Sequence, residues 1–207
     1  MIGKTFYLPL KAELRYFIEN RLNKQYLLFG EKPSVIPSEK SSQPQGLLAK
    51  VFNVKPVEIL VPEDPDFSIV IPKIGANARI LADIDASDEK LYLEALKKGV
   101  AQAAGTAFPG EGGHIFLFAH STDYIWNVGS YNAVFYLLYK LEKDDEINIY
   151  YHGQRFVYQV IDKKTVDPDQ VEYLTRKTNK EFLTLQTCWP PGTTLKRLLV
   201  MATRVTE

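Results

Sequence analysis

The chain has 207 residues, of which 45% are apolar and 12% aromatic, so it can bury one substantial core and carry an appendage. Its 25 basic residues balance its 25 acidic residues, which argues against recruitment of nucleic acid or anionic lipid by net charge. The single cysteine and the three histidines lack the spacings of a structural zinc site, so we expect no metal and no cofactor.

No stretch of the sequence approaches the run of about 18 apolar residues that predicts a membrane-spanning helix. The first residues do not open the long apolar run of a signal peptide either. We therefore expect a soluble polypeptide, or a soluble piece of a longer one whose membrane anchor lies outside this sequence.

The first segment has the periodicity of an amphipathic helix. Over residues 8–29, apolar residues recur at three- and four-residue spacings, and Gly30 can end the helix. We predict that the apolar face packs on the protein's own domain and that the charged face is solvated; a membrane-proximal stalk or an oligomer contact is the alternative. The apolar face carries Leu10, Leu14, Phe17, Ile18 and Leu22, and the charged face carries Lys11, Glu13, Arg15, Glu19 and Lys24.

A polar stretch rich in Pro and Ser, residues 31–46, follows this helix and is typical of a linker. We divide the chain into an N-terminal helical segment over 1–30, a linker and lead-in over 31–66, and a compact domain over 67–207.

Short strands dominate the compact domain. Two helices are expected among them, over about 88–98 with Gly99 as its end, and over about 130–140. The dipeptide His152-Gly153 between two strands predicts a tight hairpin. At least seven strands with two or three short helices predict a mainly β fold, a barrel or a sandwich. The expected strands are 67–72, 79–81, 113–119, 146–151, 155–163, 182–188 and 195–203.

Cys188 is the only cysteine of the chain, so it cannot form an intramolecular disulfide. It ends the predicted strand 182–188. If this strand forms an antiparallel hairpin with 195–203, Leu195 lies near Cys188 and Arg197 lies diagonally, about 7 Å away, on the same face. A guanidinium there can stabilise a thiolate or a developing oxyanion.

A nucleophilic thiol needs a partner that transfers protons. His120 follows the apolar strand 113–119, just as Cys188 ends its own strand. His114 lies at the other end of that strand, and His152 lies in the predicted hairpin turn. A lone cysteine is also a common buried apolar residue, and strand-end histidines and arginines are common at surfaces. Periodicity alone therefore leaves the choice between a catalytic and a structural cysteine open.

The same residues resemble a known family. Residues 184–188, Thr-Leu-Gln-Thr-Cys, followed by Arg197, are similar to the Thr-Leu-x-Thr-Cys and arginine of the sortases, the cysteine transpeptidases of bacterial surfaces. Ile-Pro-Lys-Ile-Gly at 71–75 is similar to their first strand, and the resemblance extends over 67–203. Shorter matches follow in family order at 99–101, 105–106, 109–113 and 119–121.

The chain departs from the family pattern in two places. Ala119 precedes His120 where many sortases have glycine, although a small residue is kept. Residues 64–67, Asp-Pro-Asp-Phe, match only imperfectly the Asp-Pro-aromatic lid of pilus-polymerising sortases, so no lid is expected.

The resemblance implies a closed sortase-type β-barrel of about seven or eight strands, with a few short helices and an N-terminal helical appendage. It further implies that Cys188 attacks a sorting signal similar to Leu-Pro-x-Thr-Gly between Thr and Gly and forms a thioacyl-enzyme. His120 is then the acid for the departing amine and the base for the incoming one, and Arg197 binds substrate or stabilises the oxyanion.

Two further residues are expected at the substrate. Thr187 lies on the opposite strand face from Cys188, which favours a hydrogen bond from its backbone over one from its hydroxyl. Trp189, together with Tyr124 or Trp126, is expected to wall the cleft, although ordinary packing explains these aromatic residues equally well.

The implied partners are the sorting-signal peptide of secreted proteins and an amine acceptor on the cell wall or on a pilin, at the extracytoplasmic face of the bacterial cell membrane. Nucleic acid is not an expected partner. Two other functions stay open. One is a cysteine peptidase that only hydrolyses with the same residues, and the other is a non-catalytic β-barrel that binds a ligand at a degenerate site.

Overall fold

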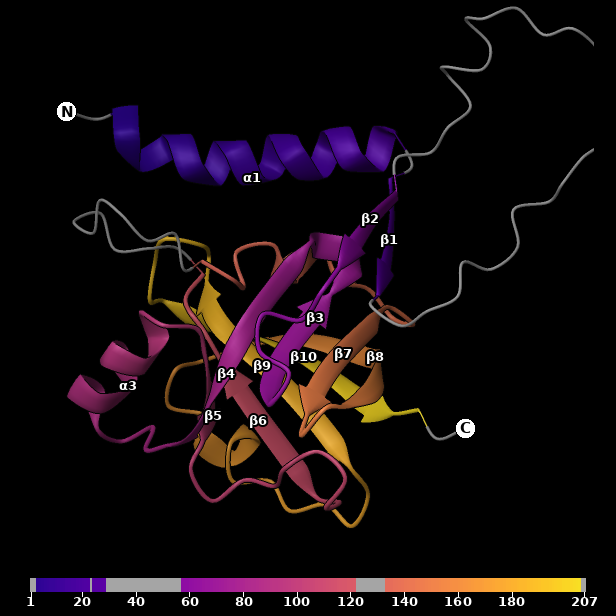
Figure 1. Ribbon diagram of the computed structural model, residues 1–207. Coiled ribbons are helices and arrows are strands. Elements are labelled where there is room, and N and C mark those ends of the chain that lie inside the picture. Colours follow the sequence, from indigo (N-terminus) through magenta and orange to yellow (C-terminus); the bar gives the residue numbers. More distant parts are fainter. Residues whose placement is uncertain (1–2, 23, 29–56, 122–132, 206–207) are drawn as a thin grey trace, which may run out of the picture.

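The computed structural model describes residues 3–22, 24–28, 57–121 and 133–205. Within them, eight strands close into a barrel in the order β10-β8-β7-β3-β4-β5-β6-β9, with β9 pairing back to β10 (Figure 1). The predicted mainly β, closed-barrel fold is therefore confirmed. The barrel strands are β3 (Phe67–Ile71), β4 (Ala76–Ile84), β5 (Val100–Ala103), β6 (His114–Phe118), β7 (Glu146–Tyr151), β8 (Gln154–Val166), β9 (Phe182–Trp189) and β10 (Lys196–Arg204).

Alternating apolar residues fill the barrel. Ile69, Ile149, Leu183, Leu185 and Val200 all point into one core cluster and are fully buried. Each such side chain contributes about 1.5–3 kcal/mol by leaving water. The side chains between them on each strand face outward, so strand parity decides which residues can form a surface site.

The hairpin between β7 and β8 forms as predicted. His152 and Gly153 both have positive φ, 49° and 74°, which suits the backbone twist of a two-residue turn. Its two amides bind the carbonyl oxygens of Asp66 and Pro65, at distances of 3.0 Å each. The lid-like segment 64–67 is thereby held at the barrel end where β7 meets β8, away from the end at which β9 finishes.

The strand after Ile-Pro-Lys-Ile-Gly is longer than predicted. A short 3₁₀ helix, η1 (Pro72–Ile74), ends at Gly75 with φ of 60°, and β4 starts at the next residue. Alanines have low strand propensity, and for this reason the pattern did not reveal the start of β4. Ala76 and Ala78 are nevertheless buried in the barrel core, where small side chains fit.

Helix α3 (Glu89–Leu96) begins where predicted, with the Asp88 carboxylate accepting a hydrogen bond of 3.0 Å from the Leu91 amide. The role expected for Gly99 is wrong, because the helix is capped at Lys97 in a right-handed conformation. A Cβ on Gly99 would lie 2.5 Å from the carbonyl oxygen of Arg79, so glycine is required there for close approach to β4.

The second predicted helix, over 130–140, is also wrong in the part that the structure describes. Residues 134–137 form turns, and only a 3₁₀ helix, η2 (Leu138–Lys140), follows. Leu138 and Leu141 are buried in the barrel core. The apolar residues of this segment therefore contribute to the core without forming an α-helix. The linker 31–46, Tyr124 and Trp126 lie outside the described residues.

The N-terminal helix α1 (Gly3–Arg21) is shorter than predicted, because β1 (Gln25–Leu28) follows it. β1 pairs in parallel with β2 (Val57–Leu60). This two-stranded sheet packs on the outside of the barrel, where the buried residues are Leu28, Leu60, Val70 and Tyr150. The helical pattern predicted through residue 29 is therefore replaced after Arg21 by a strand, because Leu28 packs against the outside of the barrel.

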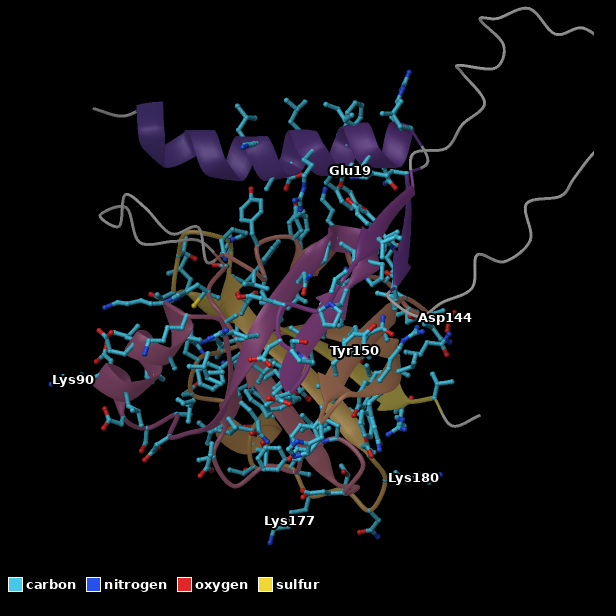
Figure 2. The ribbon with its side chains drawn as sticks, viewed as in Figure 1. Glu19, Lys90, Asp144, Tyr150, Lys177 and Lys180 are labelled. Atoms are coloured by element: carbon cyan, nitrogen blue, oxygen red, sulfur yellow. The ribbon has the colours of Figure 1, made fainter. Side chains whose placement is uncertain are left out.

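The orientation predicted for α1 is wrong as well. The helix lies across one end of the barrel (Figure 1), and Glu19 is on the side that faces the barrel (Figure 2). Leu10 and Phe17 on the other side expose 65% and 60% of their surface. This end of the barrel offers polar partners rather than an apolar groove, so Glu13 and Glu19 of the predicted charged face pack inward, whereas Lys11 stays exposed. Among the described residues, no helix is both long and apolar enough to cross a membrane.

Candidate active site

Three neighbouring strands carry the predicted site residues to one end of the barrel. β9 pairs in parallel with β6 and antiparallel with β10, so it lies between them. In the parallel ladder Phe118 lies beside Gln186, and the next backbone hydrogen bond joins the Ala119 amide to the Gln186 carbonyl oxygen at 3.1 Å. His120 follows two residues after Phe118, past the end of β6, and Cys188 follows two residues after Gln186. Neighbouring strands are about 4.8 Å apart, so a continuation of this register beyond Ala119 predicts that imidazole and thiol lie side by side.

Arg197 lies directly opposite Cys188 in the β9–β10 ladder. The predicted register, with Leu195 nearest Cys188, is therefore wrong by two residues, because β9 continues to Trp189 and the connection between the two strands is 190–195 in place of 189–194. Arg197 Nη1 donates hydrogen bonds to the carbonyl oxygens of Thr194 (3.1 Å) and Lys196 (3.2 Å). These bonds fix the guanidinium at the strand end, and its other nitrogens have no acceptor among the described residues.

Cys188 is a free, half-buried thiol on the outer face of the barrel. Leu183 and Leu185, at alternate positions of the same strand, are fully buried in the core. A cysteine that served only as core filler would share their face. The strand parity predicted for Cys188 thus agrees with the burial pattern, and its sulfur lies where a ligand outside the barrel can reach it.

Thr187 holds two of these strands together just beside the site. Its hydroxyl is buried and donates a hydrogen bond of 2.9 Å to the carbonyl oxygen of Ala119. Parity predicted a backbone role for Thr187, whereas the structure gives its side chain a hydrogen bond. Because Ala119 immediately precedes His120, this bond fixes the backbone that carries the imidazole. Such a bond contributes about 0.5–1.5 kcal/mol.

Trp189 is half-buried at the end of β9 and connects the site to α1. Its ring centroid is 5.3 Å from that of Tyr139. The Tyr139 hydroxyl donates a hydrogen bond to the Glu13 carboxylate, and Glu13 also forms an ion pair with Lys140 at 3.4 Å. Burial, together with this carboxylate, raises the pKa of Tyr139. Sequence reasoning missed Glu13 and Tyr139, since residues so far apart in the chain give no periodic signal.

The other two histidines lie elsewhere. His114, at the far end of β6, is buried and shares a hydrogen bond of 2.9 Å between its Nε2 and the Thr184 hydroxyl. Burial lowers the pKa of His114 to about 4, so its imidazole is neutral at pH 7. His152 occupies the β7–β8 turn. Of the three histidines, only His120 lies at the barrel end where β9 carries Cys188.

Comparison with known proteins agrees with this geometry. A family model described as the Sortase domain matches residues 69–205. Sortase D of Bacillus subtilis is 30% identical over 188 residues, which are 88% of this chain and 82% of that protein.

Solved structures of similar fold are sortases as well. Sortase C-1 of Actinomyces oris is 31% identical with a TM-score of 0.57, over 70% of this chain and 76% of that one. The structure of Clostridium perfringens sortase C with the C-terminal cell wall sorting motif is 29% identical with a TM-score of 0.54, over 68% of this chain and 70% of that one. Family match, relative and fold all agree, and the chain belongs to the sortase family, whose general role is that of a cysteine transpeptidase.

Proposed function

We propose that this sortase cleaves a sorting signal similar to Leu-Pro-x-Thr-Gly between Thr and Gly and transfers the acyl part to an amine. The observation that supports the proposal is that β9, with Cys188 near its end, is flanked by β10, which places Arg197 opposite Cys188, and by β6, which leads to His120. A relative of similar fold was solved with the C-terminal cell wall sorting motif, which supports a peptide of this kind as substrate.

The first half-reaction forms a thioester. The Cys188 thiol transfers its proton to His120, and the sulfur attacks the threonine carbonyl carbon of the sorting signal. Negative charge develops on the carbonyl oxygen, where the guanidinium nitrogens of Arg197 that lack acceptors can donate hydrogen bonds. The carbon–nitrogen bond then breaks, and the glycine amine leaves with the proton from His120.

The second half-reaction transfers the acyl group. An incoming amine attacks the thioester carbonyl carbon, gives its proton to His120, and expels the Cys188 sulfur. The acceptor amine is proposed to belong to the cell wall or to a pilin, at the extracytoplasmic face of the membrane. Since this half-reaction needs an amine in place of water, a wall of apolar surface beside the sulfur favours transfer over hydrolysis.

Trp189 and Thr187 have separate proposed roles. Trp189 follows Cys188 directly and is held by Tyr139, so we assign it to the wall of the substrate site. The Thr187 hydroxyl is already bound to Ala119, so its contribution to substrate binding is to position His120.

The test is acyl-enzyme formation with a library of sorting-signal peptides, followed by mass spectrometry. Wild-type protein is expected to gain the mass of the peptide's acyl fragment, and Cys188→Ala is expected to gain none while remaining folded by circular dichroism. Cleavage that persists in Cys188→Ala would refute the assignment of the nucleophile.

Adding an amine separates the two catalytic functions. A transpeptidase gives an amide product whose yield rises with amine concentration, whereas a peptidase that only hydrolyses gives the free acid in both cases. A protein that forms no acyl-enzyme with any peptide, and whose thiol fails to react with a substrate mimic, would be a binding module instead.

A further inference from the structure

The outward face of α1 is an unpartnered apolar stripe, and we call Leu10, Leu14, Phe17, Ile18 and Leu22 the α1 stripe. All five expose between 45% and 65% of their surface, and they recur with helical spacing along one side. Single exposed apolar residues are ordinary at protein surfaces, but five on one helix face form a continuous patch of the kind that marks an interaction surface.

The helix is held in place by its other face, so the stripe is not exposed through fraying. Arg15 Nη2 donates a hydrogen bond to the Ile74 carbonyl oxygen at 3.4 Å, and Tyr16 packs against the barrel core. The Glu13 carboxylate accepts the Tyr139 hydroxyl and pairs with Lys140. Polar anchoring of this kind leaves the apolar side pointing away from the protein.

The charges of α1 are sorted between its two sides. The acidic residues face the barrel and are paired there, Glu13 with Lys140 and Glu19 with Lys24 at 3.1 Å. Lys11 and Arg21 are exposed and lie on the side of the stripe, with no ion-pair partner among the described residues. The outward side is therefore apolar and cationic although the whole chain is neutral.

We propose that α1 binds the surface of an anionic lipid bilayer through this stripe. Helices that lie in a membrane interface combine an apolar face of Leu and Phe with basic residues, and they sink by about 5–10 Å into the headgroup region. Lys11 and Arg21 then reach the lipid phosphates. A second copy of the chain fits less well, because two stripes packed together bring Lys11 and Arg21 of one copy against the same cations of the other.

This binding mode orients the barrel. α1 lies across the end of the barrel where Trp189 packs on Tyr139, so the site at Cys188 would face the bilayer side (Figure 1). The proposal refines the proposed function by placing its peptide chemistry close to the membrane. It rests on the faces of α1 and not on the reactivity of the thiol.

The test is co-sedimentation of the full chain with vesicles, either of phosphatidylcholine alone or with phosphatidylglycerol added. Binding to the phosphatidylglycerol vesicles is expected, and it should weaken as salt rises. The double variant Leu14→Ser/Phe17→Ser is expected to bind at least about tenfold more weakly, because both apolar side chains are lost. Lys11→Gln and Arg21→Gln should each reduce binding by about fivefold.

Leu91→Ser is the matched control, since Leu91 on α3 is also an exposed leucine of a helix, 46% accessible, and it should leave binding unchanged. Failure of the wild type to bind phosphatidylglycerol vesicles would overturn the proposal, as would full binding by Leu14→Ser/Phe17→Ser. So would a stable dimer in analytical ultracentrifugation that these substitutions dissociate. Acyl-enzyme formation in vesicle-free buffer should be equal in the wild type and the double variant, which separates this proposal from the fate of the proposed function.

Discussion

Strand β6 and its exit carry a histidine at each end on the same face, and the two differ in almost every physical respect. His114 is buried between the rings of Phe116 and Phe182, with centroids 5.7 and 5.8 Å away, and its Nε2 is bound to a threonine hydroxyl. His120 is half-buried beside the strand end of Cys188. Identical side chains thus have different surroundings: burial keeps His114 neutral, and the chain leaving β6 carries His120 to the barrel end at which β9 carries the thiol.

The largest expected difference concerns catalysis. His120→Gln should lower the rate of acyl-enzyme formation by on the order of 10²–10⁴-fold, since general acid–base catalysis is lost. His114→Gln should leave that rate within about threefold, because its imidazole does not reach the site. Stopped assays by mass spectrometry at pH 7 measure both. A similar loss of acyl-enzyme formation rate in His114→Gln and His120→Gln would contradict the assignment of the proton transfer to His120 alone.

The second expected difference concerns stability against pH. The folded-state pKa of His114 is about 4 against 6.5 for the free side chain, so the unfolded chain binds the proton more readily. The stabilisation from this shift is complete above pH 6.5 and is lost as the pH falls toward 4, by on the order of 3 kcal/mol.

Urea unfolding between pH 7.5 and pH 4.5 measures this loss. His114→Gln should flatten the pH dependence of the free energy of unfolding, while His120→Gln should leave it as in the wild type. Parallel pH curves for wild type and His114→Gln would contradict the assignment of the acid sensitivity to His114.

The smallest expected difference is between two threonines of β9. Thr187 binds the backbone before His120, and Thr184 binds His114. Thr187→Val should slow acyl-enzyme formation about tenfold, and Thr187→Ser, which keeps the hydroxyl, should restore it. Thr184→Val should leave the rate unchanged and cost about 1 kcal/mol of stability.

Kinetics with varied peptide concentration add a readout that packing alone would not change. For Thr187→Val the loss is expected in the maximal rate and not in the half-saturating peptide concentration. Equal rates of acyl-enzyme formation in Thr187→Val and Thr184→Val would contradict the proposal that Thr187 positions His120.

Much of the barrel end was predictable from the sequence because strand parity is a local property. The alternation of Leu183 and Leu185 with Cys188 gave the correct face for the thiol, and the turn at His152-Gly153 gave a correct hairpin. The exact partner of Cys188 was not predictable, since the position of the turn sets the register and the prolines of residues 190–191 do not show that β9 continues to Trp189.

The errors share a physical cause. Amphipathic spacing in α1 identifies an apolar stripe but does not say which surface the stripe faces, and here polar contacts of Glu13 and Arg15 decided the orientation. The apolar pattern over 130–140 predicted an α-helix, yet the described residues from 133 onward form turns and the short 3₁₀ helix η2, and their apolar side chains pack in the barrel core. In both places long-range packing determined the outcome, which no local pattern records.

The parallel pairing of β6 with β9 also has a consequence for folding. His120 and Cys188 are 68 residues apart in sequence (188 − 120), so their approach closes a long loop. Closing such a loop costs conformational entropy before any contact compensates it, and folds dominated by distant contacts form slowly. A nascent or partly folded chain therefore carries a cysteine with no histidine beside it, and the proposed catalytic pair exists only once the last barrel strands have joined.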